Sequence, residues 1–400
     1  MEGKDKILGY LRKDGGKGIR NKILVIYTSG CAASAAFELK EAFAEKADID
    51  VIGTESCRRD EAMARKLKTF ATHQNVGAVL VVRNGCEETD GREITEAAAD
   101  SGRPCGIVDI SRQGSPGAVR EGLRLLNGFL DELAMVPRVP ISLPELVIGV
   151  ECGGSDFTSG LAANRLVGEF ADYAVKQGGT VLFEEMYEAM GLKDYLLSRC
   201  ETEKAKKQIG ETYDKFYRHA LEEGQFSISP GNIRGGLTTI EEKSMGAVVK
   251  SGTQTIQGVL KICERPPCPG LWHLDCMGDT RKGCGFPVSN DASSTLMFLL
   301  SGAHMTILTT GRGHVISNPV GPVFKLTGNP WTYESLKDDI DFDASPLLTG
   351  EQSVAGLLDR LMALVMETAG GRRCKGERNG HAEGVLNHEI QYGPGEEEQW

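Results

Sequence analysis

The sequence predicts an α/β protein with two Rossmann-like parallel-sheet domains, a helical insertion and a loose C-terminal tail. Short apolar runs with strand character alternate with helix-like segments along both halves of the 400-residue chain. Glycine fills 50 positions, about one in eight, which indicates many tight turns. Four apolar runs end within a few residues of a cysteine, at Cys31, Cys57, Cys86 and Cys152. Because the carboxyl ends of parallel strands meet at one edge of a sheet, we expect these thiols where α/β proteins build sites.

The first domain is predicted over residues 1–135. Its strands are expected at 22–27, 49–53, 76–82 and 105–109, and its helices at 32–46, 58–72, 91–101 and 115–134. A linker is predicted over residues 136–144, because Pro137, Pro140 and Pro144 fall within a few residues of one another. Proline is accepted neither inside a helix nor in a central strand.

The second domain is predicted over residues 145–370. It begins with a strand at 145–150, a helix at 161–177 and a strand at 179–184. A helical insertion follows at about 193–223, and its many Lys and Glu residues indicate a solvated arm or lid. Residues 371–400 are polar and glycine-rich, so we expect a loosely packed tail unless it crosses to another subunit.

Composition excludes several classes of function. The net charge of −11 disfavours nucleic acid, whose phosphates are bound through clustered Lys and Arg. No apolar stretch reaches 18 residues and the first residues lack the apolar core of a signal peptide, so we expect no membrane partner and a cytoplasmic location. Neither the dinucleotide fingerprint nor the P-loop motif occurs. Eleven cysteines without a sign of secretion favour metal ligands or nucleophiles over disulfides.

The segment Glu151-Cys-Gly-Gly-Ser-Asp156 is a candidate anion site between a predicted strand and a predicted helix. Gly153 and Gly154 let backbone amides approach a substrate carboxylate, while Ser155 and Asp156 supply polar contacts. The competing interpretation is a glycine turn followed by a helix N-cap.

Three further segments carry candidate residues. Lys243 follows a glycine-rich turn and a Thr-Thr pair, where it could bind a carboxylate or act as a base; alternatively it is a surface lysine. Arg312, in Thr309-Thr-Gly-Arg-Gly-His314, has the fork geometry for carboxylate recognition, or is simply solvent-exposed. Residues 12–21 could form an anion-binding strap, although a mobile basic terminus is favoured.

Other histidines and cysteines are weaker candidates. His304 and His314 could be metal ligands, but packing or hydrogen bonding is the favoured interpretation. Cys263, Cys268, Cys276 and Cys284 fall within 22 residues, yet they lack the Cys-x-x-Cys pairs of zinc ribbons, which disfavours a zinc site.

Taken together and in order, these segments resemble the altronate/galactarate dehydratase family of 2-hydroxy-acid lyases, which includes sulfolactate sulfo-lyase large subunits. The resemblance runs from about residue 9 to 390. It rests on Gly9-Tyr-Leu-Arg-Lys-Asp-Gly with Gly18-Ile-Arg-Asn, Gly85-Cys-Glu87, Cys152-Gly-Gly-Ser-Asp156 with Ala163-Asn164, Pro230-Gly-Asn with Gly236-Leu-Thr-Thr and Glu242-Lys-Ser, Thr309-Thr-Gly-Arg-Gly, and Leu326-Thr-Gly-Asn-Pro with Thr332-Tyr333.

The resemblance implies elimination of water, or of sulfite in the sulfo-lyases, from a sugar acid or small hydroxy acid, with iron or another divalent metal required. The catalytic candidates are Lys243 as the first choice of base, Asp275 as the second, and Asp156. The substrate-binding candidates are Arg20, Asn21, Gly153, Gly154, Ser155, Asn164, Thr238, Thr239 and Arg312. The metal candidates are Cys31, Cys57, Cys86 and Cys152, as a shared site for Fe²⁺ or an iron–sulfur cluster, with Mn²⁺ as the alternative ion.

Two departures from the family bear on function. Relatives carry a small N-terminal β domain or pair with a small subunit, whereas this chain starts almost at the Gly9-Tyr10 motif, so a separate small β-rich subunit and a homo- or hetero-oligomer are expected. Where relatives tend to read Met-Asp-Thr-Pro, this chain has Leu274-Asp-Cys-Met277. The leading prediction is the large catalytic subunit of a metal-dependent hydro-lyase. The alternatives are a sulfo-lyase on the same fold and a non-catalytic homologue that binds a sugar acid.

Overall fold

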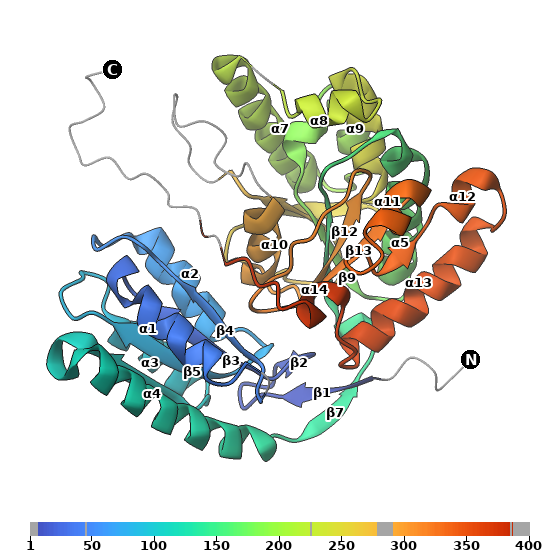
Figure 1. Ribbon diagram of the computed structural model, residues 1–400. Coiled ribbons are helices and arrows are strands. Elements are labelled where there is room, and N and C mark those ends of the chain that lie inside the picture. The colour runs from blue at the N-terminus through green and yellow to red at the C-terminus, as the bar shows by residue number, and fades with distance from the viewer. Residues whose placement is uncertain (1–6, 45, 225, 278–290, 385, 387–400) are drawn as a thin grey trace, which may run out of the picture.

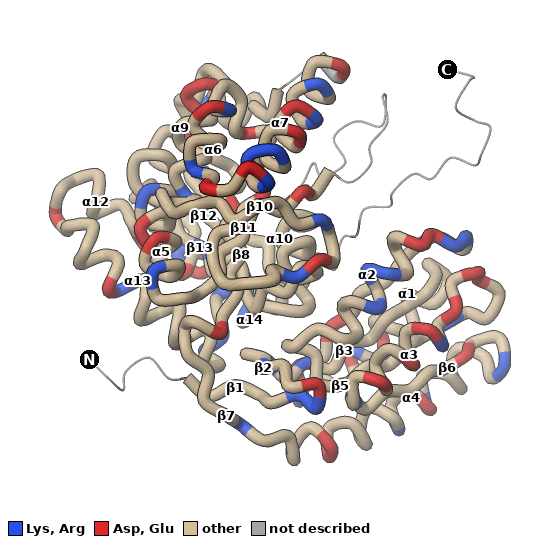
Figure 2. Tube along the Cα trace, turned by 180° about the vertical axis from the view of Figure 1, so that it is seen from behind, with Lys and Arg blue, Asp and Glu red and all other residues tan. Residues whose placement is uncertain are grey.

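The computed structural model describes residues 7–44, 46–224, 226–277, 291–384 and 386. It is an α/β structure with two parallel sheets, each covered by helices, and a small antiparallel sheet between them (Figure 1). Within the described residues, no helix is both long and apolar enough to cross a membrane. Figure 2 shows Lys and Arg interspersed with Asp and Glu along α7 and across α1 to α4.

The N-terminal sheet is parallel and has the strand order β4-β3-β5-β6. Its strands are continuous apolar runs because both faces are covered. Their bounds are β3 (Lys22–Tyr27), β4 (Ile49–Gly53), β5 (Val76–Arg83) and β6 (Cys105–Asp109). These strands coincide with the predicted ones to within one residue.

Four helices cover the N-terminal sheet, two on each face. α1 (Gly30–Glu41) and α4 (Ile110–Ala134) pack on one face, and α2 (Glu61–Ala71) and α3 (Gly91–Asp100) on the other. Asp60 and Asp90 cap α2 and α3 by accepting backbone N–H bonds from the first turn. α4 is interrupted at Gly114, where φ is 69°, so its regular part begins next to Pro116.

The predicted linker contains a strand. β7 (Arg138–Ile141) pairs with β1 (Ile7–Leu11), which also pairs with β2 (Lys17–Gly18), so the small sheet has the order β2-β1-β7. Because β7 lies at an edge of this sheet, it tolerates Pro140.

The central sheet is parallel throughout and has the strand order β10-β11-β9-β8-β12-β13-β14. Its two central strands, β8 and β9, are each followed by a polar loop. The bounds are β8 (Val147–Cys152), β9 (Thr180–Phe183), β10 (Ile256–Lys261), β11 (Gly270–Asp275), β12 (Met305–Thr310), β13 (Val323–Thr327) and β14 (Phe342–Asp343).

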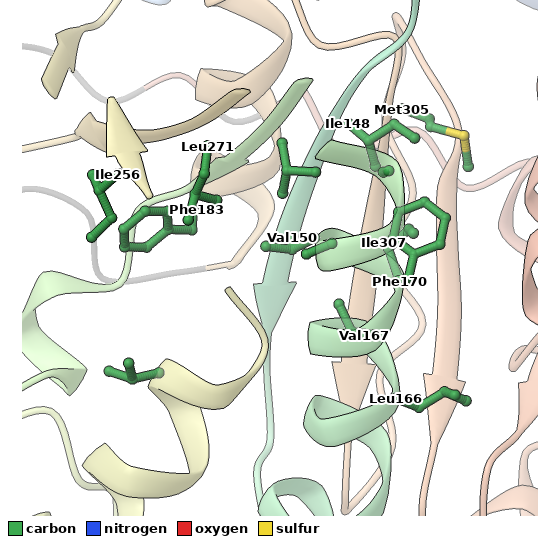
Figure 3. Packing of buried hydrophobic residues seen from close by; sticks show 14 of the residues in the cluster. Ile148, Val150, Leu166, Val167, Phe170, Phe183, Ile256, Leu271, Met305 and Ile307 are labelled. Atoms are coloured by element: carbon green, nitrogen blue, oxygen red, sulfur yellow. The ribbon is translucent and has the colours of Figure 1, made fainter. Parts of the chain in front are cut away.

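Buried aliphatic side chains join the central sheet to its helices. Ile148 and Val150 of β8 face α5, where Val167 and Phe170 meet them (Figure 3). A further core contains residues of α2 and α3 from the N-terminal sheet and residues of β11 and α10 from the central sheet.

Most helices after residue 142 surround or cap the central sheet. Their bounds are η1 (Leu143–Glu145), η2 (Ser159–Ala163), α5 (Asn164–Lys176), η3 (Met186–Glu188), α6 (Lys193–Ser198), α8 (Pro230–Arg234), α9 (Ile240–Val249), α10 (Asp291–Leu300), α11 (Pro330–Ser335), α12 (Pro346–Thr349) and α13 (Val354–Ala369).

Two segments pack more tightly than the sequence predicts. α7 (Glu203–Glu223) lies in the expected solvated arm, but it buries a stripe at helical spacing that includes Ile209, Tyr213 and Phe216. In the expected loose tail, α14 (Lys375–Arg378) packs against the body and the preceding Cys374 is 1% exposed. The prediction of loose packing is therefore wrong for residues 374–377, while residues 371–373 and 378–380 are exposed and residues 387–400 lie outside the described residues.

Candidate active site

The candidate active site lies at the carboxyl ends of β8, β9 and β12, which are neighbours in the central sheet. The Cys152-Gly-Gly-Ser-Asp156 motif follows β8 directly and forms a tight turn in which φ of Gly154 is 62°. This turn is bonded to the loop after β12, because Arg312 N donates to Gly154 O at 2.9 Å and Gly153 N donates to Thr309 O at 2.9 Å. Two motifs about 160 residues apart thus form one rim, as expected for the edge of a parallel sheet.

A thiol and two carboxylates meet at this rim. The Cys152 thiol donates to Glu185 Oε1 at 2.8 Å and lies 3.3 Å from Glu188 Oε2. Among the described residues, Cys152, Glu185 and Glu188 are the one group of three potential ligands whose donor atoms all lie within 4.8 Å of one another. Glu185 and Glu188 come from the loop and short η3 helix after β9. Sequence reasoning missed both.

Lys243 of α9 and Lys250, the C-cap of the same helix, balance this negative charge. Lys243 Nζ lies 2.5 Å from Glu188 Oε1, and Lys250 pairs with Glu185 and lies 3.5 Å from the Cys152 sulfur. The capping box of Thr239 and Glu242 fixes the start of α9 and so places Lys243 in its first turn. Lys250 follows two turns later on the same face of the helix. Lys243 is 6% exposed, so the interpretation as a surface lysine is wrong.

Burial and charge shift several pKa values at the site. Burial, followed by the charge of Glu188, raises the pKa of the Cys152 thiol to about 11. Burial lowers the pKa of Lys243, but the charges of Glu188 and Cys152 outweigh it and leave the pKa above its ordinary value. Behind the site, burial raises the pKa of Glu184 to about 7 and that of Glu151 well above its ordinary value.

A histidine–carboxylate pair stands over the glycine turn. His314 Nε2 lies 2.7 Å from Asp291 Oδ2, and a Cβ built on Gly153 would come within 2.0 Å of that oxygen and 2.7 Å of His314 Cδ2. Glycine at position 153 therefore makes room for this pair. Sequence reasoning considered His314 only as a ligand or packing residue and missed Asp291, which is distant in sequence.

Several predicted residues form the walls of this site. Ser155 donates to the Cys152 sulfur at 3.3 Å. Asn164 binds Gly246 O of α9 at 2.9 Å and accepts a 2.5 Å bond from Thr309, so it joins β12 to α9. Arg312 Nη1 donates to Gly231 O at 2.8 Å and is exposed. These contacts bring together residues from three of the motifs that carry the family resemblance.

Other predicted residues make local structural contacts. Asp156 accepts bonds from Thr158 and Ser159 at the start of η2, which is the expected N-cap arrangement, and also from Asn329 at 2.8 Å. Thr238 and Thr239 bond with Glu242 at the start of α9. Their substrate-binding or catalytic roles stay predictions.

Asp275 lies at the end of β11 and pairs with Lys215 of α7 at 2.5 Å. Within the described residues, no bond joins it to Cys152, Glu185 or Glu188. Cys276 follows it and is buried, with its pKa raised by burial and then by Glu184 and Glu151. Cys284 lies outside the described residues, so the group of Cys263, Cys268, Cys276 and Cys284 cannot be assembled.

Arg20 and Asn21 lie just before β3, at the amino end of the N-terminal sheet. The Arg20 guanidinium binds both carboxylate oxygens of Glu377, at 2.7 and 2.8 Å, and Asn21 accepts a 2.6 Å bond from Arg12. Arg20 is 5% exposed. Its bonds therefore tie the N-terminal segment to α14.

The four predicted metal cysteines have different surroundings. Cys31, Cys57 and Cys86 are exposed at the carboxyl edge of the N-terminal sheet, while Cys152 is buried with Glu185 and Glu188 at the edge of the central sheet. Metal binding by any of them stays a prediction. A cavity of about 290 Å³, whose lining does not include Cys152, is lined by Ser155, Asp156, Asn164 and Lys243 together with apolar side chains of η2 and α9.

Comparisons with known proteins cover nearly the whole chain. Residues 143–391 match the family model described as D-galactarate/Altronate dehydratase, C-terminal, and residues 9–134 match D-galactarate dehydratase/Altronate hydrolase, second domain. The (2R)-sulfolactate sulfo-lyase subunit beta of Chromohalobacter salexigens is 31% identical over 95% of this chain and 96% of that protein. The altronate dehydratase of Escherichia coli is 31% identical over 92% of this chain and 75% of that enzyme.

The galactarate dehydratase (L-threo-forming) of Escherichia coli is 28% identical over 77% of this chain and 59% of that enzyme. The two family models together span both parallel sheets, and the thiol–carboxylate site falls within residues 143–391, the part matched by the C-terminal model. The chain therefore belongs to the altronate/galactarate dehydratase family.

Proposed function

We propose that this chain is the catalytic subunit of a metal-dependent hydro-lyase that dehydrates a sugar acid or small 2-hydroxy carboxylate to a 2-keto acid. The observation that carries the proposal is the meeting of Cys152, Glu185 and Glu188 with Lys243 and Lys250, all within the residues that the C-terminal family model matches. The two parallel sheets support a division into two Rossmann-like domains, with this chemistry in the second.

The thiol–carboxylate group suits a divalent cation. One thiolate offers a sulfur donor and two carboxylates offer oxygen donors. Iron is bound by both kinds of donor in proteins, whereas Mn²⁺ is suited mainly to the carboxylate oxygens. In the structure, the ammonium groups of Lys243 and Lys250 contact the same carboxylates. A cation held by Cys152, Glu185 and Glu188 would supply Lewis-acid chemistry toward a carboxylate or hydroxyl of the substrate.

The proton transfers of the reaction require a base for the Cα–H bond and an acid for the departing hydroxyl. Lys243 remains our first choice for one of these roles through its Nζ, with Asp275 as the second choice. We add His314, whose ring is oriented by Asp291 in the manner of a positioned acid or base. Gly153, Gly154, Ser155 and Arg312 line the same rim and would bind the substrate carboxylate, and Asp156 would hold their turn in place.

A sulfite-releasing reaction is the second candidate. The observation that favours it is the match to a sulfo-lyase subunit over 96% of that protein's length. Because that relative is named a subunit, we propose that this chain also works with a separate small β-rich subunit, in an oligomer. The same Lys243, His314 and carboxylate-binding rim would serve either leaving group.

The test is an activity screen of the chain purified without oxygen, alone and with candidate small subunits, in the presence of Fe²⁺ or Mn²⁺. Altronate, galactarate and sulfolactate are supplied, and 2-keto acid and sulfite are measured separately. We expect keto acid from a sugar acid. Sulfite from sulfolactate would instead establish the second candidate.

Matched variants locate the chemistry. Lys243→Met should reduce turnover on the order of 100-fold or more, and Glu188→Gln should weaken binding of the added metal. Lys337→Met is the control, because Lys337 is an exposed lysine that pairs with the exposed Glu334. No product from any substrate, metal and subunit combination, together with sugar-acid binding, would instead identify a non-catalytic homologue.

A further inference from the structure

A second cavity lies at the amino ends of β8 and β12, on the opposite edge of the central sheet from the candidate active site. Its volume is about 300 Å³, which is at the lower end of the range for small-molecule pockets. Because β8 is six residues long, its two ends lie roughly 17 Å apart. This space, which we call the amino-edge cavity, is therefore separate from the site at Cys152.

The walls of the amino-edge cavity come from several parts of the chain. They include Gly16 in the turn between β1 and β2, Lys17 in β2, Gln74 before β5, Arg265 between β10 and β11, and Gly302 and His304 before β12. Hydrogen bonds hold these parts together, because Gln74 Nε2 donates to Gly302 O at 2.7 Å and His304 Nε2 donates to Lys17 O at 3.0 Å. The cavity is therefore formed before any ligand enters it.

Arg265 is the charged residue of this cavity that has no counter-ion. It is exposed, and it makes no hydrogen bond or ion pair with the residues that the structure describes. Its aliphatic stem lies over Gly302, where an added Cβ would come within 3.3 Å of Arg265 Cγ. A side chain at position 302 would also be strained, because φ is 90° there. Glycine at position 302 therefore makes room for this guanidinium at the cavity wall.

The carboxylates at the cavity are already paired with other cations. Lys17 pairs with Glu145, the one acidic residue of the described lining, and also donates to Pro140 O at 3.0 Å. Beside Gly16, Asp14 Oδ2 accepts from Arg103 Nη1 at 3.1 Å. Neither carboxylate pairs with the guanidinium of Arg265.

Two arginines behind the wall add to the positive charge. Arg12 Nε donates to Gln74 O at 2.7 Å, and Arg103 Nη2 donates to His73 O at 3.1 Å. Burial, followed by the charge of Arg103, lowers the pKa of Arg12 to about 10. Burial also lowers the pKa of Arg103, and the charge of Arg265 acts in the same direction. These cations repel one another, and an anion in the cavity would relieve that repulsion.

We propose that the amino-edge cavity binds a small oxyanion, a carboxylate or a phosphate, through the guanidinium of Arg265, with Lys17 as the second cation. The planar fork of a guanidinium fits two oxygens of either group. Because the walls come from the small sheet and from loops of both parallel sheets, the bound anion stabilises the contact between them. Binding of the anion does not depend on the proposed hydro-lyase activity.

The experiment measures binding and not the reaction. The full chain, without added metal, is titrated with inorganic phosphate and separately with pyruvate in Tris buffer, with ionic strength held constant by sodium chloride. Isothermal titration calorimetry measures the affinity, and thermal unfolding measures Tm. We expect saturable binding of at least one anion and a Tm that rises with its concentration. The anion that binds more tightly identifies the source of the oxyanion.

Matched variants locate the bound anion. Arg265→Met keeps the aliphatic stem over Gly302 and should weaken binding at least about tenfold, because a charge-assisted hydrogen bond is lost. Arg120→Met is the control, because Arg120 is an exposed arginine of α4 that does not line the cavity. Lys243→Met should also bind the anion as the wild type does, because that lysine belongs to the candidate active site.

Three results would overturn the proposal. The first is that neither anion binds, or that sodium chloride alone raises Tm as much. The second is that Arg265→Met binds the anion as tightly as the wild type. The third is that Lys243→Met loses binding while Arg265→Met keeps it, which would place the anion at the candidate active site. Circular dichroism of each variant confirms that a loss of binding is not a loss of the fold.

Discussion

At the scale of single residues, Arg20 illustrates what a sequence reveals about a side chain and what it does not. Composition favours a mobile basic terminus at residues 12–21, and the family resemblance assigns Arg20 to the substrate, but in the structure Arg20 is buried and binds a carboxylate of the chain itself with both arms of its fork. That carboxylate belongs to Glu377, which is 357 residues away. The residues around Arg20 contain no information about a partner so far away in the chain. From the sequence alone, a substrate carboxylate and a distant side-chain carboxylate are therefore equally good partners for this guanidinium.

The Arg20–Glu377 pair predicts a specific dependence of stability on pH. Hydrogen bonds and charge from Arg20 outweigh the burial that opposes them and lower the pKa of Glu377 from 4.5 to about 2. A lowered carboxyl pKa stabilises the fold above the unfolded pKa, and the effect is lost as pH falls through the folded value. The contribution at neutral pH is about 3 kcal/mol.

Glu377→Gln should therefore lower the free energy of unfolding by about 3 kcal/mol at pH 7 and by much less near pH 3. Urea unfolding at the two pH values measures this difference. Glu367→Gln is the control, because Glu367 is exposed and its ion pair with Arg372 is 3.8 Å long. An equal loss of stability at both pH values would contradict an ionic contribution.

Also at this scale, some residues of the candidate site could be named from the sequence and others could not. Cys152 and Ser155 were candidates because they lie in a motif of glycine and polar residues after an apolar run, and Lys243 was a candidate because it follows a glycine-rich turn and a Thr-Thr pair. Glu185 was missed, although it directly follows the strand predicted at 179–184 and meets the criterion that singled out the cysteines. Lys250 and Asp291 have no such signal, since only the packing of α9 and α10 brings them to the site.

At the scale of elements, continuous apolar runs predicted the strands of the N-terminal sheet to within one residue. Runs of this kind are unambiguous because both faces of a parallel sheet are buried. β7 was not predicted, because the prolines around it indicated a linker. Proline is tolerated in a strand that lies at the edge of a sheet. The burial of α7 was missed because its many charges conceal the stripe of Ile209, Tyr213 and Phe216.

The turn after β8 gives a prediction at the same scale. Gly153→Ala places a Cβ within 2.0 Å of Asp291 Oδ2, so the carboxylate must move away from His314. We expect kcat to fall about 100-fold if His314 has the proposed acid–base role, because its ring loses the orientation that Asp291 gives it. The free energy of unfolding should fall by about 1 to 3 kcal/mol, as for other overpacked positions.

Steady-state kinetics and thermal unfolding of Gly153→Ala test this together. Gly128→Ala is the control, because a Cβ at that exposed position of α4 would meet no atom within 4 Å. Full kcat in Gly153→Ala would show that the His314–Asp291 pair is not needed for turnover.

At the scale of the whole molecule, the two parallel sheets are joined by more than chain connectivity. They share an apolar core that runs from α2 and α3 to β11 and α10. Beside it, the loop before β5 donates buried bonds to the loop before β12: Gln74 to Gly302 O at 2.7 Å and Asn75 to His304 O at 2.8 Å. We call the contact between the loop before β5 and the loop before β12 the seam. The sequence could not predict it, because the residues that it joins are about 230 positions apart.

His304 connects three parts of this seam. Its Nδ1 accepts a 3.0 Å bond from Val147 N of β8, which places the ring proton on Nε2, and Nε2 donates to the carbonyl of Lys17 in the small sheet at 3.0 Å. A second proton would have to bind Nδ1 and break the bond to Val147. Burial lowers the pKa of His304 from its ordinary value of 6.5 to about 4. The charge of Arg265 acts in the same direction, and together they outweigh the hydrogen bonds with Lys17 and Val147.

A lowered histidine pKa means that the unfolded chain binds more protons than the folded one between about pH 6.5 and 4, so stability falls as pH decreases through that window. The loss amounts to about 3 kcal/mol for His304, and buried His73, whose pKa is also lowered by burial, adds to it in the same direction. His304→Gln should be less stable than the wild type at pH 7 and should show a shallower decline of the free energy of unfolding toward pH 4.5. Urea unfolding across this range, with His381→Gln as the control at the surface, measures both effects. An unchanged slope in His304→Gln would assign the acid sensitivity of the seam to other groups.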